Sequence, residues 1–263
     1  MTLDDLFSAE RPLEKWNLQG FHGAPVFLFP EIGSTNHWMK ERWTENSHGS
    51  IALADQQNSG RGRFQRVWRS PAGKNIYLSL LLKPETIPLT QWAHLTQVAA
   101  ITLAKFFEEI GLPVHVKWPN DILFQGKKMC GILSERISRG GSSGLVLGMG
   151  ININSTPEDF EGLDRLASSL RIELGRPVNR EVFLQEFLNR LEIAFKDFES
   201  TGIEPWLTAW RGMKNFFGSP ARLVQVDQVT EGIIQDICPD GSLLFLPDGQ
   251  SIPIVIYSGD LEI

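Results

Sequence analysis

Short apolar runs and amphipathic segments alternate through the first half of the chain. A helix is predicted over residues 34–43, where Ser34 or Thr35 is a favourable amino-terminal cap. A second helical pattern covers Thr90–Ile110 and stops at Gly111. The uninterrupted apolar runs predict strands at Pro25–Phe29, Ser50–Ala54 and Asn75–Leu82. This alternation predicts a mixed α/β region.

Two more strands and a long helix follow. The strands are predicted at Met129–Arg136 and Gly144–Asn152, and the Gly/Ser-rich turn at residues 138–143 indicates that they form a hairpin. Asn179 caps an amphipathic helix with a continuous apolar stripe. The stripe consists of Val182, Phe183, Phe187, Leu191, Ala194, Phe195 and Phe198.

After Asn215 the pattern changes to short β-rich runs separated by Asp-Gly pairs at 240–241 and 248–249, which predicts a small antiparallel barrel. The runs are Ala221–Val226, Gly232–Ile237, Ser242–Leu246 and Ile252–Ile256. We therefore expect an N-terminal extension at 1–25, a mixed-sheet domain flanked by helices at 26–215 and a C-terminal barrel at 216–263.

Composition narrows the class of protein. The net charge of −6 disfavours binding to DNA or another large polyanion, so an anionic ligand is expected to be small. The apolar runs at Ile76–Leu82 and Leu145–Ile151 are far shorter than the roughly 18–20 residues of a membrane-spanning helix. An acidic start without an apolar core disfavours export, and the distant Cys130 and Cys238 disfavour a disulfide framework or a structural zinc site. A cytoplasmic protein is expected.

The segment Gln57–Trp68 interleaves Arg61, Arg63 and Arg66 with two glycines. Glycine lets a backbone approach a ligand closely, and arginine offers forked donors to phosphate or carboxylate oxygens. This pattern is typical of a loop that orders over an anionic ligand. A solvated basic loop is the alternative interpretation.

Three further segments contain candidate residues for ligand binding or catalysis. In Lys117–Ile122, Asn120 and Asp121 follow a proline-fixed turn, where a carboxylate can bind magnesium or accept a proton, although Pro-Asn-Asp is also an ordinary turn sequence. Lys128 precedes a strand and can enter a site as a point charge, or simply face solvent. In Gly148–Asn154 the glycines permit either close approach of a ligand or tight core packing.

Taken together and in this order, these segments resemble the biotin protein ligase family over roughly residues 26–263. The matching motifs are Ser34-Thr-Asn36, Gln57 with Gly60-Arg-Gly-Arg63 and Trp68, Lys117-Trp-Pro-Asn-Asp121, Lys128 with Gly131-Ile-Leu133, and Gly150-Ile-Asn152. The resemblance implies an α+β fold, with a mixed-sheet catalytic domain flanked by helices and a small SH3-like antiparallel barrel at the C-terminus.

The resemblance also implies the reaction and its residues. In the family, biotin and ATP give biotinyl-5′-adenylate and pyrophosphate, and a lysine of a biotin carboxyl carrier protein then accepts the biotin. The catalytic residues implied are Lys128, Arg61 and Asp121. The biotin-binding residues implied are Ser34, Thr35, Asn36, Gln57, Gly60, Arg61, Arg63, Lys128 and Gly131. The nucleotide-binding residues implied are Arg63, Arg66, Trp68, Lys117, Asn120, Lys128 and Asn152. Asn120 and Asp121 are candidates for a Mg²⁺ site.

Two other functions stay open at this point. A lipoate or octanoate ligase or transferase shares the fold, but its arginine and glycine-rich signature with a downstream histidine is not found here. A noncatalytic biotin or adenylate sensor is the other alternative, against which Lys128 and Asp121 argue. Part of the family has an amino-terminal winged helix that binds DNA, and the residues before position 25 are too few for one, so no DNA partner is expected. A homodimer is left open.

Overall fold

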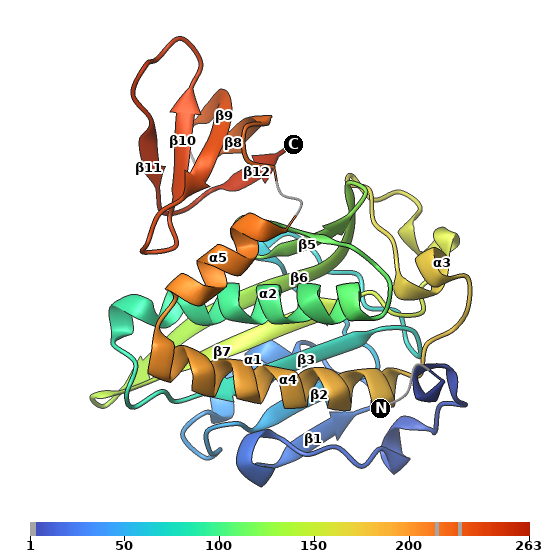
Figure 1. The fold of residues 1–263 in the computed structure, drawn as a ribbon. Coiled ribbons are helices and arrows are strands. Elements are labelled where there is room, and N and C mark those ends of the chain that lie inside the picture. Colours follow the sequence, from blue (N-terminus) through green and yellow to red (C-terminus); the bar gives the residue numbers. More distant parts are fainter. Residues whose placement is uncertain (1–3, 214–215, 226–227) are drawn as a thin grey trace.

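The computed structural model describes residues 4–213, 216–225 and 228–263, and it places a seven-stranded mixed sheet at the centre of the larger domain (Figure 1). The strand order is β1-β2-β3-β7-β6-β5-β4, with β1 parallel to β2 and the other neighbours antiparallel. The strands are β1 (Val26–Phe29), β2 (Ile51–Ala54), β3 (Ile76–Leu82), β4 (His115–Lys117), β5 (Asp121–Phe124), β6 (Lys127–Arg139) and β7 (Ser142–Ile151).

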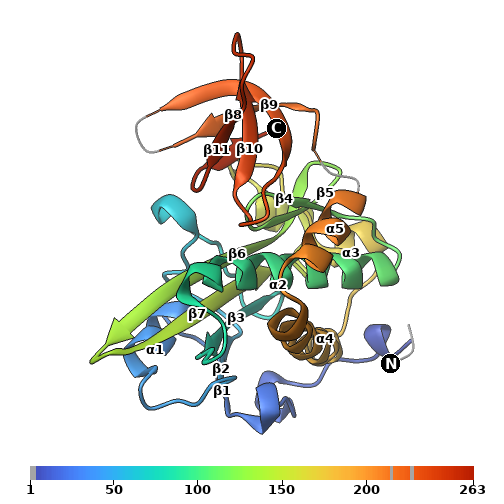
Figure 2. The ribbon, with the colours of Figure 1, turned by 60° about the vertical axis from the view of Figure 1, so that its left-hand side comes forward.

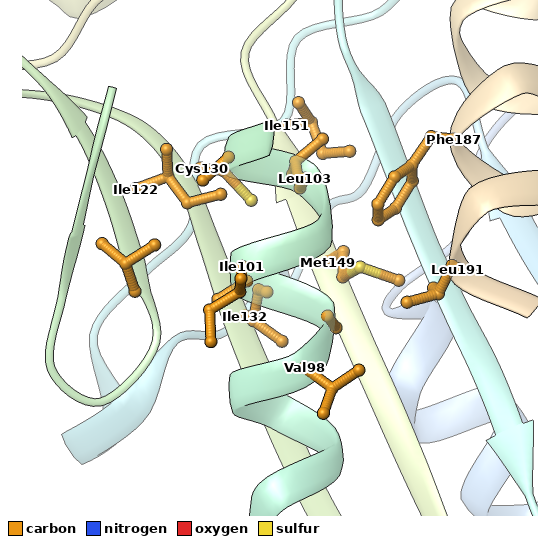
Figure 3. Packing of buried hydrophobic residues seen from close by; sticks show 14 of the residues in the cluster. Val98, Ile101, Leu103, Ile122, Cys130, Ile132, Met149, Ile151, Phe187 and Leu191 are labelled. Carbon is orange, nitrogen blue, oxygen red and sulfur yellow. The ribbon is translucent and has the colours of Figure 1, made fainter. Parts of the chain in front are cut away.

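Helices cover both faces of this sheet. Alternate residues of a strand point to opposite faces, so Leu78 and Met149 belong to the main core while Leu81 and Val146 form a smaller cluster with Met39 of the first helix. Figure 3 shows the main core, where α2 and α4 meet the sheet. The helices are α1 (Thr35–Arg42), α2 (Trp92–Glu109), α3 (Leu170–Leu174), α4 (Arg180–Thr201) and α5 (Glu204–Gly212).

The C-terminal domain is a separate five-stranded antiparallel sheet with the order β11-β10-β9-β8-β12. Its strands are β8 (Pro220–Val224), β9 (Val229–Ile237), β10 (Leu243–Pro247), β11 (Ile254–Ile256) and β12 (Asp260–Glu262). The predicted Asp-Gly turns are present, with φ of +78° at Gly241 and +74° at Gly249. Figure 1 shows this domain beyond α5 and β5. The predicted fold class is confirmed.

Some sequence-based boundaries fall on residues that the structure does not describe. The expected domain boundary at Asn215 lies outside the described residues, as does the expected end of the first barrel strand at Val226. The hairpin of β6 and β7 is longer than predicted, because its polar outer half continues the strand pairing to Arg139 and Ser142. Figure 2 shows this hairpin projecting from the sheet.

The chain before β1 packs on the larger domain through three short 3₁₀ helices, in which Leu6 and Phe21 are buried. The 3₁₀ helices of the described chain are η1 (Asp5–Phe7), η2 (Leu13–Lys15), η3 (Phe21–Gly23), η4 (Arg63–Gln65), η5 (Leu89–Gln91) and η6 (Pro157–Phe160). Over the same described residues, none of the helices has the length and apolar character needed to cross a bilayer.

Candidate active site

A cavity of about 670 Å³ opens where the start of α1, the loop after β2 and the glycine-containing parts of β6 and β7 meet. The segment 159–167 and two residues of β12 line it as well. Its volume falls within the range of small-molecule sites. Residues as far apart in sequence as Ser34 and Glu262 therefore contribute to one cavity.

One wall of the cavity is a polar network built at the start of α1. Ser34 caps this helix, because its hydroxyl accepts the N–H of His37. The backbone N–H of Thr35 donates to Gln57 Oε1 at 2.9 Å, and Ser79 Oγ lies 2.8 Å from Thr35 Oγ1 and 2.5 Å from Asn36 Oδ1. Such a buried network holds its donors and acceptors in fixed positions.

The network continues along the loop and across the sheet. Gln57 donates to Ser70 Oγ at 3.1 Å. This bond joins the two sides of the arginine loop, the segment between β2 and β3 that contains Arg61, Arg63 and Arg66. On the other side, Asn36 donates to Glu135 Oε2 at 2.9 Å. A Cβ at Gly148 would lie 2.1 Å from Asn36 Oδ1, so glycine is needed for Asn36 to lie against β7.

The floor of the cavity is a cross-strand pair of glycines. Gly131 of β6 lies opposite Gly150 of β7, and the Trp68 ring rests on them both. A Cβ would lie 2.3 Å from Trp68 Cε2 at Gly150 and 2.9 Å from Trp68 Cζ3 at Gly131. The indole Nε1 is buried and has no hydrogen-bond partner among the described residues. The glycines thus admit a flat aromatic group to the backbone of the sheet.

Lys128 brings a positive charge into the same cavity. Its Nζ lies 2.7 Å from Asp121 Oδ1 and 5.4 Å from the centre of the Trp68 ring. The backbone of Lys128 is fixed by its N–H bond to Leu166 and by the Asn152 amide, which donates to the Lys128 carbonyl at 3.1 Å. The ammonium is therefore held between a carboxylate and an aromatic face.

The loop between β2 and β3 carries the predicted arginines to the other side of the cavity. Arg61, Arg63 and Arg66 all line it. Arg63 donates to the Gly259 carbonyl at 2.9 Å, and Arg66 pairs with Asp260. Burial lowers the pKa of Arg63 from its ordinary value, although nearby carboxylates oppose this effect. The side chains of Arg63 and Arg66 thus reach the C-terminal domain.

The sequence of this chain is similar to those of known ligases. The sequence profile of the biotin/lipoate A/B protein ligase family matches residues 28–152. The bifunctional ligase/repressor BirA of Bacillus subtilis (strain 168) is 34% identical over 245 residues, which are 92% of this chain and 74% of that protein. This chain belongs to the biotin protein ligase family. The biotin–[acetyl-CoA-carboxylase] ligase of Mycobacterium tuberculosis is 30% identical over 240 residues, covering 88% of this chain and 86% of that protein.

A solved ligase structure supports the same assignment. The biotin protein ligase from Aquifex aeolicus in complex with biotin and ATP superimposes with a TM-score of 0.77 at 28% sequence identity. The match covers 90% of this chain and 97% of the Aquifex chain, so it includes both domains. Membership in the biotin protein ligase family therefore rests on sequence and fold together.

Most of the sequence-predicted residues meet in this ligase cavity, and two do not. Lys117 is buried and does not line the cavity, and Gly60 lies within the loop, where a Cβ would be 2.6 Å from the Trp68 carbonyl oxygen. The predicted residues that line the cavity are Ser34, Thr35, Asn36, Gln57, Arg61, Arg63, Arg66, Trp68, Asn120, Asp121, Lys128, Gly131 and Asn152.

The C-terminal domain of this ligase supplies a residue that sequence analysis missed. Asp260 Oδ1 lies 3.1 Å from Lys117 Nζ, and Asp260 Oδ2 pairs with Arg66 and, at 2.8 Å, with Arg165. Burial tends to raise the pKa of Asp260, but Lys117 and the two arginines outweigh burial and lower it. Asp260 thereby joins β12, the arginine loop and the 159–167 segment. A lone aspartate near the chain end gave no motif by which to find it.

Asn120 and Asp121 are the candidate ligands of Mg²⁺ predicted from the sequence. Both carboxylate oxygens of Asp121 face ammonium groups, from Lys128 at 2.7 Å and from Lys117 at 3.5 Å. Asn120 donates its amide to the Ile132 carbonyl. Within the described ranges, no group of three or more His, Cys, Asp and Glu residues is placed to hold a metal. These two side chains therefore do not fit a protein-held Mg²⁺ site.

Proposed function

We propose that this chain condenses biotin with ATP in the cavity and transfers the biotinyl group to a lysine of a biotin carboxyl carrier protein. Its activity is that of a biotin–[acetyl-CoA-carboxylase] ligase, as its relatives indicate. The observation that supports the chemistry best is one ammonium, Lys128, in the same cavity as three loop arginines and a polar wall.

The first step joins two anions. A carboxylate oxygen of biotin attacks the α-phosphorus of ATP, the new O–P bond forms, and the bond to the pyrophosphate oxygen breaks. Repulsion between the reactants has to be cancelled by positive charge fixed in advance. Lys128 Nζ lies 2.7 Å from Asp121 Oδ1, and we propose that this ammonium bridges the biotin carboxylate and the α-phosphate. Arg61, Arg63 and Arg66 add charge around the phosphates.

The polar network at the start of α1 and the three loop arginines differ in chemistry, and we base the division between the two ligands on this difference. The ureido ring of biotin needs donors and acceptors inside an apolar slot, and the network of Thr35, Asn36 and Gln57 offers both. We place biotin there, with Ser34 and the Gly131 backbone beside it. We place the nucleotide toward Arg63, Arg66, Trp68, Asn120 and Asn152, which line the same cavity.

The second step needs a deprotonated amine. The acceptor lysine attacks the carbonyl carbon of the mixed anhydride, the C–N bond forms, and AMP leaves as the C–O bond breaks. Asp121 lines the cavity and holds Lys128, so we propose that it orients Lys128 in the first step and receives the amine proton in the second. A closed loop excludes water, which otherwise hydrolyses the anhydride.

Mass spectrometry of a purified carboxyl carrier domain tests this function. The domain is incubated with the protein, MgATP and biotin, and a mass increase of one biotinyl group is expected. Parallel reactions replace biotin with lipoate or use Lys128→Ala protein. Modification by lipoate in place of biotin would assign the lipoyl activity, and pyrophosphate release without any modified acceptor would contradict the transfer step. Binding of biotin without pyrophosphate release would indicate a sensor.

A further inference from the structure

A buried guanidinium lies outside the cavity, at the first residue of α4. The Arg180 side chain is only 6% exposed. Its Nε lies 2.9 Å from Glu10 Oε1, and its Nη2 lies 2.5 Å from the same oxygen. The backbone N–H of Arg180 also donates to Glu10 Oε2 at 2.9 Å. Trp16 covers the group, with 5.3 Å from Arg180 Cζ to the ring centre. The N-terminal segment thus encloses Arg180 from one side.

The other side of the same guanidinium holds both ends of the arginine loop. Arg180 Nη1 donates to Asp55 Oδ1 at 2.8 Å and to the Asn75 carbonyl at 3.1 Å. Asp55 directly follows β2, and Asn75 directly precedes β3. The second carboxylate oxygen of Asp55 accepts the N–H of Gly73 at 2.8 Å. One nitrogen of Arg180 therefore bridges the two stems of the loop.

The held stems are directly connected to the cavity. Asn75 lines it, and the Asn75 amide oxygen accepts the N–H of Ile153 at 2.9 Å, just beyond β7. Asp55 is two residues before Gln57, which belongs to the polar wall. A shift of either stem would move Gln57, the arginines and Trp68 together. Small displacements of positioned groups reduce rates strongly even when the altered residue is remote.

We propose that Arg180 is a positioning residue for the arginine loop. Glu10, in the N-terminal segment, fixes Arg180 and thereby controls the affinity of the loop for its ligands. Glu10 accepts most of the hydrogen bonds of the guanidinium and so fixes the face that Arg180 presents to Asp55 and Asn75. The inference rests on the proposed function, because the loop residues are those proposed to bind biotin and ATP.

Matched variants separate this role from general stabilisation. Arg180→Gln leaves two partly buried carboxylates without a cation and risks misfolding, so Glu10→Gln and Asp55→Asn are used. The control is Arg11→Gln, because Arg11 lies in the same segment and pairs with Glu181 of the same helix. Each protein is assayed for KM and kcat in pyrophosphate release, and for the rate of tryptic cleavage at Arg61, Arg63 and Arg66 with and without biotin and ATP.

Glu10→Gln and Asp55→Asn are expected to raise the KM for both ligands and the rate of loop cleavage about tenfold, at temperatures where all proteins are folded. Arg11→Gln is expected to match the unaltered protein in both measurements. Cleavage and KM values for Glu10→Gln that equal those of Arg11→Gln would overturn the inference. If the unaltered protein releases no pyrophosphate, the proposed function fails, and the ligand-free cleavage rates still decide whether Glu10 and Asp55 restrain the loop.

Discussion

Lys128 and Lys127 are adjacent in sequence and each pairs with a carboxylate, but they lie in different surroundings. Lys128 lines the cavity against Asp121 and Trp68, whereas Lys127 pairs with Glu173 and has a 40% exposed side chain. Alternation along β6 sends the two ammonium groups to opposite sides. The pair therefore offers a direct test of the charge proposed to bridge the reactants.

Lys128→Ala is expected to slow biotinyl-adenylate formation several hundred-fold, because losing one fixed electrostatic donor costs about 3–4 kcal/mol in the barrier. Pyrophosphate release at saturating biotin and ATP measures the rate. Lys127→Ala is the control and should stay within about twofold, since exposed ion pairs contribute little. Similar losses in the two variants would argue against a bridging role for Lys128.

Gly150→Ala is expected to raise the KM for biotin or ATP about tenfold, because the added methyl group would occupy the space of the Trp68 ring. Steady-state kinetics with each substrate varied in turn measures the effect. A Cβ at Gly212 would meet no described atom within 4 Å, so Gly212→Ala is a suitable control. An unchanged KM in Gly150→Ala would show that substrate binding does not depend on the contact between the Trp68 ring and Gly150.

Among the elements, those with strong local signals were predictable. The pattern over Thr90–Ile110 predicted α2 (Trp92–Glu109), and the Asn179 cap predicted the start of α4. Ser79 lies inside a fully buried strand, where its hydroxyl is indistinguishable by pattern from a packing residue. The contacts of the arginine loop could not be predicted from the sequence either, because its partners at residues 161–162 and 259–260 are remote in sequence. Contacts between segments remote in sequence produce no periodic pattern of apolar residues along the chain.

Arg69→Ala is expected to raise the KM for ATP about fivefold, because Arg69 joins two segments that line the cavity. Its guanidinium donates to the carbonyls of Glu161 at 2.6 Å and Gly162 at 3.4 Å. Arg139→Ala, at the exposed tip of the β6–β7 hairpin, controls for loss of a surface charge. Equal KM values for ATP in the two variants would show that the segments do not need this link.

At the scale of the whole molecule, the Lys117-Trp118 segment joins the two domains, in addition to the arginine contacts with Gly259 and Asp260. Lys117 binds Asp260 and donates to the Leu261 carbonyl at 2.9 Å, while Trp118 and Gln97 both donate to the Gly241 carbonyl. Sequence analysis placed Lys117 among the nucleotide ligands, whereas its described contacts are with Asp121 and the C-terminal domain. The motif Lys117-Trp-Pro-Asn-Asp121 gave no sign of the contacts with the C-terminal domain, because Asp260 and Leu261 are remote from it in sequence.

Acid is expected to weaken this junction. The pKa of Asp260 is lowered in the folded protein, so its contribution to the free energy of unfolding is complete above the ordinary value of 3.8 and is lost as the pH falls below it. Asp260→Asn should therefore be less stable than the unaltered protein near neutral pH, and the difference should shrink below about pH 4. Denaturant unfolding across this range measures it. Asp248→Asn, in an exposed turn of the same domain, is the control, and a pH-independent difference for Asp260→Asn would contradict the assignment.

The reach of β12 into the proposed catalytic cavity has a consequence for genetics. Because Asp260 and Glu262 line the same space as Lys128, a selection for biotinylation-deficient clones should recover missense changes in the codons of this short terminal strand. Such alleles would map far from every recognisable motif, although they change residues that line the cavity of Lys128.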